Sequence, residues 1–309
     1  MTAILPATDH GLAQAADLLR GGGIVAVPTE TVYGLAARAD SEDAVAAIYR
    51  AKGRPAFNPL IVHVARVEQA RLLAVFDARG ERLAALFWPG PLTLVLPMRA
   101  DSGVVPAVTA GLGTIGLRVP DHPLMLALLQ RLDLPLAAPS ANRSLGVSPT
   151  TADHVARSLG EAVPAILDGG PCGQGLESTI VALRPDGSWS LLREGPVTRA
   201  ALLAELGCEP HEGKAGIEAP GQMARHYAPG KPVRLDAVTS AADEFLIGFG
   251  PVAGHCSLSE TGDLAQAAAR LYACLHQAAA SAHPRIAVAP VPHEDIGAAI
   301  NDRLRRAAA

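Results

Sequence analysis

A lysine and an arginine stand two residues apart in the segment 51–60, Ala-Lys-Gly-Arg-Pro-Ala-Phe-Asn-Pro-Leu. Lysine is rare in this chain: of 26 Lys and Arg residues, only Lys52, Lys214 and Lys231 are lysines. A compact ammonium beside a planar guanidinium suits a polyanion such as a nucleotide triphosphate. Lys52 and Arg54 are therefore candidates for phosphate binding. The structural alternative is a helix-end lysine beside a loop arginine.

Three further polar clusters lie beside predicted strands. Residues 28–35 (Pro-Thr-Glu-Thr-Val-Tyr-Gly-Leu) place threonine hydroxyls near a glycine, where a small polar ligand could approach; a Pro-led turn is the alternative. Residues 111–120 carry glycines, and Arg118 there emerges from an apolar strand and needs a carboxylate partner from protein or substrate. Residues 139–149 are rich in hydroxyl and amide groups and could equally be a surface loop. His63, in an apolar strand, is more typical of a structural histidine.

These clusters offer positive charge and hydrogen-bond donors rather than a nucleophile. The sequence contains no Walker phosphate loop, no Gly-x-Ser-x-Gly elbow and no His-Glu-x-x-His pair. Such a set favours catalysis by positioning a substrate and neutralising phosphate charge, rather than covalent catalysis.

Composition narrows the class of protein. With 309 residues, 49% hydrophobic and 18% charged, the chain is typical of a globular enzyme of one large or two ordinary domains. The net charge of −4 and the few aromatics disfavour a general nucleic-acid binder or a base-stacking platform. Four scattered cysteines suggest a reducing compartment. No apolar run is long enough to span a membrane and no secretion signal is visible, so we expect a cytoplasmic protein.

Hydrophobic periodicity predicts an α/β chain whose elements place the polar clusters at loops. Helices are predicted over 11–20, 42–52 with Ser41 as cap, 67–76, 78–87, 124–132, 151–159, 263–280 and 294–306. Strands are predicted over 24–27, 60–64, 92–96, 115–119, 136–138, 165–167, 178–183, 190–193, 233–235, 246–248 and 286–291. A Gly- and Pro-rich stretch divides the chain into a predicted catalytic domain (1–208), a linker (209–231) and a small α/β domain (232–309).

In their order, the motifs resemble those of the YrdC-like threonylcarbamoyl-AMP synthase family. The matching segments are Pro-Thr-Glu-Thr-Val-Tyr-Gly-Leu (28–35), Lys-Gly-Arg-Pro-x-x-Asn-Pro-Leu (52–60), Gly-x-Arg-Val-Pro (116–120), Pro-Ser-Ala-Asn (139–142), Glu-Ser-Thr-Ile-Val (177–181) and Arg-Glu-Gly (193–195). The segments 220–229 and 297–307 resemble the longer, two-domain branch of the family. The resemblance covers nearly the whole chain.

The resemblance implies a twisted, mixed YrdC-like sheet followed by a smaller Rossmann-like domain. It implies that L-threonine, bicarbonate and ATP, with Mg²⁺, give L-threonylcarbamoyl-AMP and pyrophosphate. By this resemblance the threonine site comprises Thr31, His63, Arg118, Ala138 and Ser178. The ATP site comprises Lys52, Arg54, Asn58, Thr114, Ser140, Asn142, Ser148, Arg193 and Tyr227, with Lys52 and Arg54 as the catalytic cations. Tyr227, in the linker, is expected to close over the nucleotide. No protein metal site is expected, because Mg²⁺ would be held mainly by phosphate and water.

The implied product serves threonylcarbamoyl modification of the adenosine next to the anticodon in certain tRNAs. The expected partners are therefore the downstream transfer machinery, with a contact to tRNA left open, and no membrane. The linker departs from the family pattern at Gln222-Met223-Ala224, where a lysine and an aromatic residue are more usual. Two rivals remain: an RNA-binding module without chemistry, and an enzyme that makes a carbamoyl adenylate from carbamoyl phosphate. The second rival would carry acylphosphatase and zinc-finger segments, which the sequence lacks.

Overall fold

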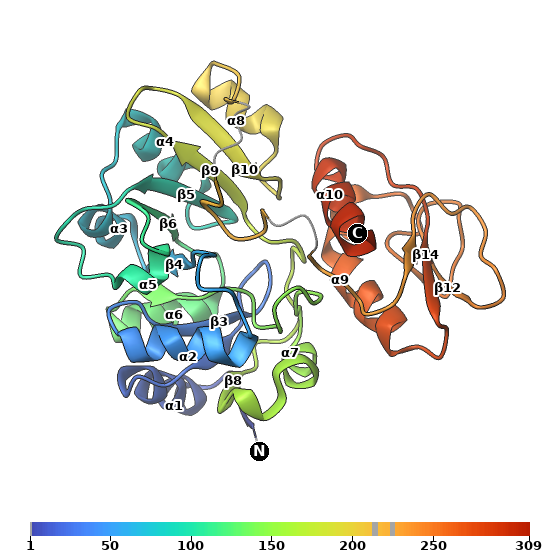
Figure 1. Cartoon of the computed structure of the whole chain (residues 1–309), viewed down its shortest axis with the longest axis horizontal. Coiled ribbons are helices and arrows are strands. Elements are labelled where there is room, and N and C mark those ends of the chain that lie inside the picture. The colour runs from blue at the N-terminus through green and yellow to red at the C-terminus, as the bar shows by residue number, and fades with distance from the viewer. Residues whose placement is uncertain (1, 212–215, 223–225) are drawn as a thin grey trace.

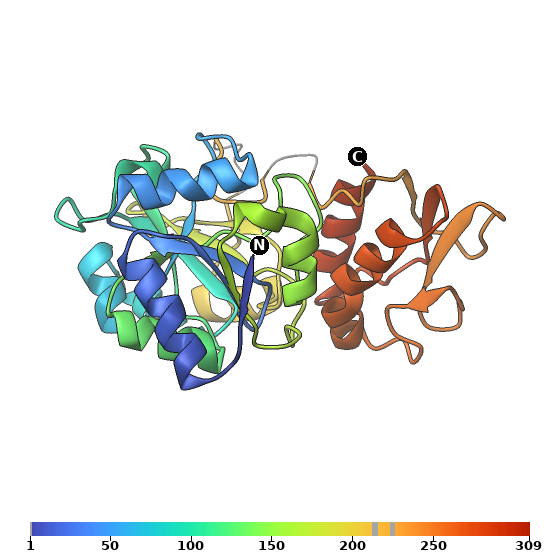
Figure 2. The ribbon, with the colours of Figure 1, turned by 90° about the horizontal axis from the view of Figure 1, so that it is seen from below.

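The chain folds into a large α/β unit and a smaller one joined by the linker (Figure 1). The computed structural model describes residues 2–211, 216–222 and 226–309. The two helices α9 (Leu264–Ala280) and α10 (Gly297–Ala308) of the small unit face the large unit, and its sheet lies on the far side of them (Figures 1 and 2). The predicted α/β class with two unequal sheets is confirmed, whereas the exact domain boundaries stay predictions.

The remaining elements have the following bounds. The strands are β1 (Ala3–Leu5), β2 (Val25–Val27), β3 (Gly34–Arg38), β4 (Ile61–His63), β5 (Leu92–Pro97), β6 (Thr114–Arg118), β7 (Leu136–Ala137), β8 (Ala165–Leu167), β9 (Thr179–Leu183), β10 (Trp189–Arg193), β11 (Val233–Arg234), β12 (Glu244–Gly248), β13 (Cys256–Ser257) and β14 (Arg285–Val288). The helices are α1 (Asp9–Arg20), α2 (Glu42–Lys52), α3 (Val67–Leu73), α4 (Ala78–Phe87), α5 (Pro106–Thr109), α6 (Pro123–Leu132), α7 (Ala152–Leu159) and α8 (Arg199–Leu206), with a 3₁₀ turn at Gly160–Ala162.

Strands of the large unit form a mixed sheet in the order β1-β8-β2-β3-β7-β4-β6-β5-β9-β10. Strands β4 and β6 run parallel at its centre, with His63 opposite Arg118, so the register alone brings these two side chains to one place. The small unit has a four-stranded parallel sheet in the order β11-β14-β12-β13. An all-parallel sheet with covering helices is the arrangement of Rossmann-like domains.

Helix α2 shows how the local sequence positions the basic pair. The Ser41 side chain caps its first turn by accepting a hydrogen bond from the backbone N–H of Ala44, and two acidic residues follow. Gly53 ends the helix with φ 61°, a left-handed conformation that glycine adopts without strain. Lys52 is therefore the last helical residue, and Arg54 leaves the helix in a new direction.

Apolar helix faces cover both sides of the large sheet. Helices α1 and α6 pack together over one side in a single apolar cluster, while α2, α4 and α7 belong to the cluster on the other. A third apolar cluster joins the two units, because Val32, Val147 and Leu176 of the large unit pack with buried residues of α9 and α10. The two units thus share a continuous apolar interface.

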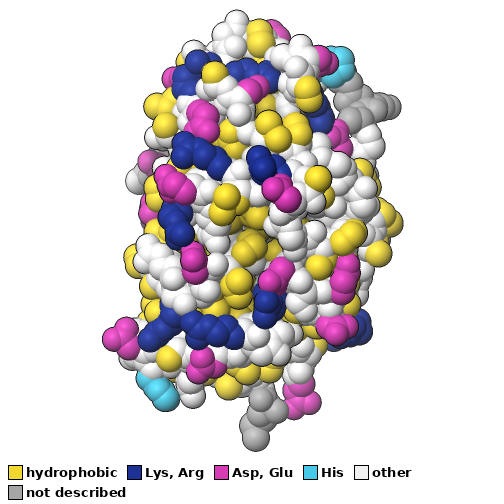
Figure 3. All heavy atoms as spheres, turned by 90° about the vertical axis from the view of Figure 1, so that its left-hand side faces the viewer, with side chains coloured by type: hydrophobic (Ala, Val, Ile, Leu, Met, Phe, Trp, Pro, Cys, Tyr) yellow, Lys and Arg dark blue, Asp and Glu magenta, His cyan; other side chains and the backbone are white. Residues whose placement is uncertain are grey.

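Within the part of the chain that the structure describes, no helix is both long and apolar enough to cross a membrane. The side of the large unit that Figure 3 shows has Lys and Arg intermingled with Asp and Glu, without an extended basic stripe. Exposed ion pairs of the large unit include Arg71 with Glu81 and Arg99 with Asp101. This face does not resemble a nucleic-acid binding surface.

Candidate active site

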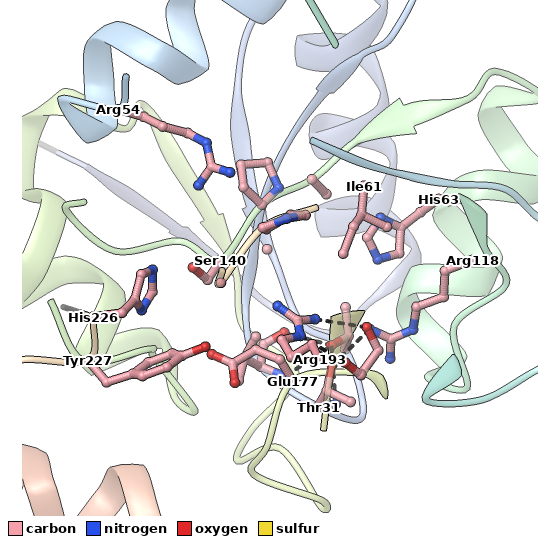
Figure 4. Close-up of a pocket in the computed structure, with 18 residues that line it drawn as sticks. Thr31, Arg54, Ile61, His63, Arg118, Ser140, Glu177, Arg193, His226 and Tyr227 are labelled. Carbon is pink, nitrogen blue, oxygen red and sulfur yellow. Dashed lines mark hydrogen bonds between the residues drawn. The ribbon is translucent and has the colours of Figure 1, made fainter. Parts of the chain in front are cut away.

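A pocket lies where the loops after β2 and β7, the strands β4 and β6, the start of β9 and the linker meet (Figure 4). All five residues predicted for threonine line it, together with four of those predicted for ATP: Thr31, His63, Arg118, Ala138 and Ser178, then Arg54, Ser140, Arg193 and Tyr227. In Figure 4, His63 and Arg118 lie on the side of the pocket opposite Arg54 and His226. We call the side with His63 and Arg118 the predicted threonine side, and the side with Arg54 the predicted phosphate side.

Arg118 is held rigidly on the threonine side, and it is only 3% exposed. Its Nε donates to the carbonyl oxygen of Gly90 at 3.1 Å, its Nη1 to Oγ1 of Thr31 at 3.0 Å and its Nη2 to Oε1 of Glu30 at 2.5 Å. The sequence predicted that this charge needs a carboxylate, and Glu30 provides one. A guanidinium has five N–H donors, so these three bonds leave two for a further ligand.

Hydroxyl groups continue from Arg118 across the floor of the pocket. Oγ1 of Thr31 lies 2.9 Å from Oγ1 of Thr29. Ser178 shares a hydrogen bond with Thr93 at 2.7 Å and accepts another from Nη2 of Arg193 at 3.0 Å. These small polar groups can fix the orientation of an amino acid whose carboxylate faces Arg118.

His63 is buried beside Arg118. Burial is the main cause that lowers its pKa to about 3, and the positive charge of Arg118 is the second. The imidazole is therefore neutral at physiological pH, with one ring nitrogen that donates a hydrogen bond and one that accepts. Its Nδ1 has no partner among the described residues. His63 is thus better suited to recognising a ligand than to acting as a cation.

Arg54 supplies positive charge on the other side, and Arg193 supplies it at the base of the pocket (Figure 4). Arg54 donates to the backbone carbonyl oxygens of Asn58 at 3.2 Å and Pro59 at 2.8 Å. Burial lowers its pKa to about 10, and repulsion from Arg193 adds to this effect. Burial likewise lowers the pKa of Arg193. Two buried guanidinium groups that repel each other are stabilised by an anionic ligand, as a phosphate site requires.

Lys52 does not line the pocket. Its Nζ donates to the carbonyl oxygen of Asn142 at 2.6 Å and to that of Ser140, so it fastens the loop that follows β7. Burial holds its pKa well below the usual range, and the charge of Arg54 lowers it further. The structure places Lys52 directly behind Ser140, and its predicted role toward the phosphates stays a prediction.

The other four predicted ATP residues also lie outside the pocket wall. Asn58 and Asn142 are buried in the two loops that Arg54 and Lys52 hold, and Ser148 donates to Oε1 of Glu177 at 2.5 Å. Thr114 lines a small neighbouring cavity together with Pro59, Pro220 and other residues. The two cavities share Ile61 and Pro220, so Thr114 lies next to the site without facing it.

Described residues of the linker form one wall of the pocket: Pro220, Gly221, His226 and Tyr227. Tyr227 is 1% exposed and has φ 62°. A cavity of about 40 Å³ remains, whereas pockets for small ligands measure about 300–1,000 Å³. A nucleotide and an amino acid would therefore fit together here only if this wall shifted. Gln222 accepts hydrogen bonds from the backbone of Glu218 and Ala219, but Met223 and Ala224, where the family pattern is broken, lie outside the described residues.

A magnesium ion would find few protein ligands here. Glu177, the carboxylate that lines the pocket, already accepts from Ser148, Tyr272 and Arg303. Over residues 2–211, 216–222 and 226–309, no group of three or more His, Cys, Asp or Glu side chains is placed to hold a metal. The pocket fits a magnesium ion only as part of a metal–nucleotide complex, held by phosphate oxygens and water.

Sequence reasoning assigned no role to several pocket residues. Thr29, Val32, Pro139, Glu177 and His226 all lie inside the quoted motifs, within two positions of residues that were assigned. Their position next to assigned residues was the available signal. The contacts of Glu177 with the small unit could not be found in this way, because its partners are about a hundred residues away in the chain.

Comparison with known proteins agrees with this geometry. Residues 17–195 match the family described as "Telomere recombination", and residues 197–309 match "Threonylcarbamoyl-AMP synthase, C-terminal domain". The threonylcarbamoyl-AMP synthase of Bacillus subtilis is 46% identical over 239 residues, which cover 75% of this chain and 68% of that protein. The enzyme of the same name from Pyrococcus abyssi is 39% identical over an alignment of 320 positions, which covers 95% of this chain and 92% of that one.

Solved structures extend the likeness to the whole fold. The crystal structure of P. abyssi Sua5 complexed with L-threonine superposes with a TM-score of 0.89 at 35% identity, covering 100% of this chain and 97% of that chain. E. coli YciO, at 23% identity and a TM-score of 0.56, shares the fold of the large unit. With its two matched domains, its pocket and these relatives, the chain belongs to the threonylcarbamoyl-AMP synthase family of enzymes, in the two-domain form that Sua5 represents.

Proposed function

We propose that this protein makes L-threonylcarbamoyl-AMP and pyrophosphate from L-threonine, bicarbonate or CO2, and ATP. The observation that carries the proposal is one pocket that joins the fixed guanidinium of Arg118 to the buried cations Arg54 and Arg193. The relatives named threonylcarbamoyl-AMP synthase and the L-threonine complex of P. abyssi Sua5 support the same assignment.

Threonine binds on the side of Arg118. The two N–H groups that Arg118 does not use within the protein form a two-point contact with the threonine carboxylate. The hydroxyls of Thr31 and Ser178 orient the rest of the molecule, and Ala138 and neutral His63 complete the site. The contact between Arg118 and Glu30 fixes the plane of the guanidinium before threonine arrives.

ATP binds on the side of Arg54 and Arg193. The threonine amino group adds to CO2 with loss of a proton, and a carbamate oxygen then attacks the α-phosphorus of ATP as pyrophosphate leaves. Arg54 and Arg193 neutralise charge on the phosphates. Lys52 holds the loop from Ser140 to Asn142 in place beside the phosphates. The remaining predicted ATP residues, Asn58, Thr114, Asn142 and Ser148, support this side from behind, and Tyr227 covers the nucleotide.

Magnesium accompanies ATP and, when bound, neutralises charge on its phosphates. The pocket supports this proposal because its charged groups are mainly cations and its one carboxylate, Glu177, is already occupied. Enclosure by the linker protects the carbamate and the mixed anhydride from water. The product then serves the cytoplasmic machinery that transfers the threonylcarbamoyl group to tRNA.

The proposal is tested by measuring pyrophosphate release from ATP and magnesium, with threonine and bicarbonate each omitted in turn. Release that needs all three substrates, with threonylcarbamoyl-AMP identified by mass spectrometry, is the expected result. Release without threonine would indicate another acceptor. Binding of tRNA by a folded protein that releases no pyrophosphate would favour the RNA-binding alternative, and activity with carbamoyl phosphate would favour the carbamoyl adenylate alternative.

A further inference from the structure

Glu177 connects the pocket to the small unit. It lies in the loop before β9 and is 5% exposed. Its Oε1 accepts from the hydroxyl of Ser148 at 2.5 Å, within the large unit. Its Oε2 accepts from the hydroxyl of Tyr272 on α9 at 2.7 Å and from Nε of Arg303 on α10 at 3.1 Å. One carboxylate therefore ties two loops of the large unit to both helices of the small unit.

The interface around Glu177 is shaped for close contact. Gly175, two residues earlier, has φ +70°, and a Cβ there would lie 2.4 Å from the carbonyl oxygen of Ala269 on α9. His276 of α9 stacks on His154 of α7 with ring centroids 3.8 Å apart, and its Nε2 lies 3.1 Å from the carbonyl oxygen of Ser148. The small unit thus contacts the backbone of the Ser148 loop and the side chain of His154.

From Glu177 the contacts continue directly to the phosphate side of the pocket. The next residue, Ser178, accepts hydrogen bonds from Arg193 through its carbonyl oxygen at 2.9 Å and its hydroxyl at 3.0 Å. Arg303 also donates to the carbonyl oxygen of Glu194, directly after Arg193, at 2.8 Å. Figure 4 shows Glu177 and Arg193 next to each other at the base of the pocket. The side chain of Arg193 is therefore held by the residue next to Glu177, and the backbone directly after Arg193 is held by Arg303 of the small unit.

The linker residue of the site rests on the same two side chains. The ring of Tyr227 stacks near that of Tyr272 with centroids 5.6 Å apart, and the guanidinium of Arg303 lies 5.4 Å from its centroid. Tyr272 and Arg303 thus contact both Glu177 and Tyr227, and both of these residues line the pocket.

Both oxygens of Glu177 are already engaged, so it has little capacity to bind a substrate or move a proton. Burial disfavours its charge, but Arg303 and then Arg193 outweigh burial, and the pKa of Glu177 is about 2. A carboxylate that stays ionised and fully bonded acts through the groups it holds. It is a positioning residue rather than a catalytic one.

We propose that Glu177, held by Tyr272 and Arg303, is the residue through which the small unit keeps the ATP side of the pocket in its binding geometry. This inference rests on the proposed function, because it assigns Arg193 and the Ser148 loop to ATP. When α9 and α10 contact Glu177, the Ser148 loop and Arg193 are placed for the triphosphate. When that contact is lost, ATP binds weakly although the large unit stays folded.

The test uses the full chain and the variants Arg303→Met, Glu177→Gln and Tyr272→Phe. Removing one partner of a buried ion pair leaves the other charge uncompensated, so the two charge variants are expected to have the larger effect. Arg285→Met is the matched control, because Arg285 pairs with Asp243 on the surface of the small unit. Thermal unfolding of each variant first establishes that it is folded.

We expect the KM for ATP to rise at least tenfold in Arg303→Met and Glu177→Gln, and less in Tyr272→Phe, with the KM for threonine changed much less. The double variant Glu177→Gln/Arg303→Met should lose less than the sum of the single variants, because each single change breaks the same pair. A merely structural role would lower the active fraction, and hence kcat, at unchanged KM; that result, or equal effects in Arg285→Met, would overturn the proposal.

Equilibrium binding of a non-hydrolysable ATP analogue, measured by calorimetry, separates this inference from the proposed function. If the wild-type protein binds the analogue but forms no threonylcarbamoyl-AMP, the proposed function fails while the positioning role can still be read from the variants. If the variants bind the analogue as tightly as the wild-type protein, the positioning role is wrong whatever the reaction is.

Discussion

The side-chain nitrogen of Lys52 lies 2.6 Å from the carbonyl oxygen of Asn142, and this bond joins the end of α2 to the loop after β7. The backbone N–H of Ser144 donates in return to the carbonyl oxygen of Lys52 at 2.8 Å. Two segments about ninety residues apart are thus bonded in both directions. A residue that the sequence marks as a phosphate ligand is therefore also the support of a pocket wall.

Replacement of Lys52 by methionine should remove this support and keep the volume. We expect the variant to remain folded, because the buried ammonium is itself costly, but to lose pyrophosphate release by at least about a hundredfold, the loss of about 3 kcal/mol of charged hydrogen bonding. Circular dichroism and the steady-state rate check both statements. Lys231→Met is the control, since Lys231 contacts Ala278 and Ser281 of the small unit. A Lys52→Met variant with wild-type turnover would contradict the role.

ATP binding should be accompanied by proton uptake. Burial lowers the pKa values of Lys52 and Arg54, and the charge of Arg54 lowers that of Lys52 further; a triphosphate bound near Arg54 favours the charged forms of both groups. At alkaline pH, calorimetry in buffers of different ionisation enthalpy should show protons taken up as ATP binds. The uptake should shrink in Lys52→Met, and equal uptake in that variant would assign it to another group.

Replacement of Arg118 by lysine should weaken threonine binding selectively. A lysine keeps the charge and loses the planar fork, and one lost charged hydrogen bond is worth about 1.5–3 kcal/mol. We expect the KM for threonine to rise about 10- to 100-fold with a smaller change for ATP. Glu30→Gln should give a weaker effect of the same kind. Arg99→Lys, at an exposed ion pair, is the control, and an unchanged threonine KM in Arg118→Lys would remove Arg118 from the site.

The stacked pair of His154 and His276 should make the interface sensitive to acid. Burial lowers the pKa of His276 and, together with the charge of His276, lowers the pKa of His154 to about 4. Asp153 and Arg157 are the other charged groups that act on this pair. Below about pH 6.5 the unfolded chain binds protons that the folded chain excludes until about pH 4, so the free energy of unfolding falls as the pH falls through this window.

His154→Phe keeps the ring contact and removes one titrating group. Its melting temperature should therefore depend less on pH between 6.5 and 4 than that of the wild-type protein. The exposed His293, replaced by asparagine, is the control. His63 and His226, whose pKa values burial lowers to about 3, contribute equally in both proteins. If the melting temperature of His154→Phe depends on pH as strongly as that of the wild-type protein, titration of this pair does not contribute to stability.

Gly175→Ala should disturb the contact between the two units. The added methyl group would lie 2.4 Å from a backbone oxygen of α9, and φ +70° strains any residue with a Cβ. We expect a loss of about 1–3 kcal/mol in the free energy of unfolding, together with a higher KM for ATP. Gly173→Ala, in the same loop with no atom near its Cβ position, is the matched control. Equal behaviour of the two variants would mean that the close approach is not needed.

Much of the fold could be predicted from periodicity and capping. Helix α2 and strand β8 have the predicted bounds. A serine cap, an acidic first turn and a terminal glycine mark the ends of α2, and an isolated apolar run marks β8. The last strand was predicted to reach Val291 but ends at Val288, just before the ladder would meet Pro290, which has no N–H. The other predicted helices and strands are present in the predicted order, although some of their ends differ.

Elements that depend on distant partners were not predicted. Strand β3 has the sequence Gly-Leu-Ala-Ala-Arg, with no β-branched residue, and is a strand because it pairs with β2 and β7. Helix α8 and the short strands β1 and β13 were missed as well. The motifs were enough to identify most residues that line the pocket. The contacts of Glu177 with Tyr272 and Arg303 could not be predicted, because they depend on how the two units lie against each other, which no local sequence pattern encodes.

The most direct test of the proposed reaction is to follow the carbon atom of bicarbonate. The full-length protein is incubated with ¹³C-bicarbonate, L-threonine, ATP and magnesium, and the products are identified by carbon NMR and mass spectrometry. The account predicts one labelled carbonyl carbon, bonded to the threonine nitrogen and linked through oxygen to the phosphate of AMP, formed together with pyrophosphate. An adenylate formed without the label, or no adenylate from a folded protein, would contradict it.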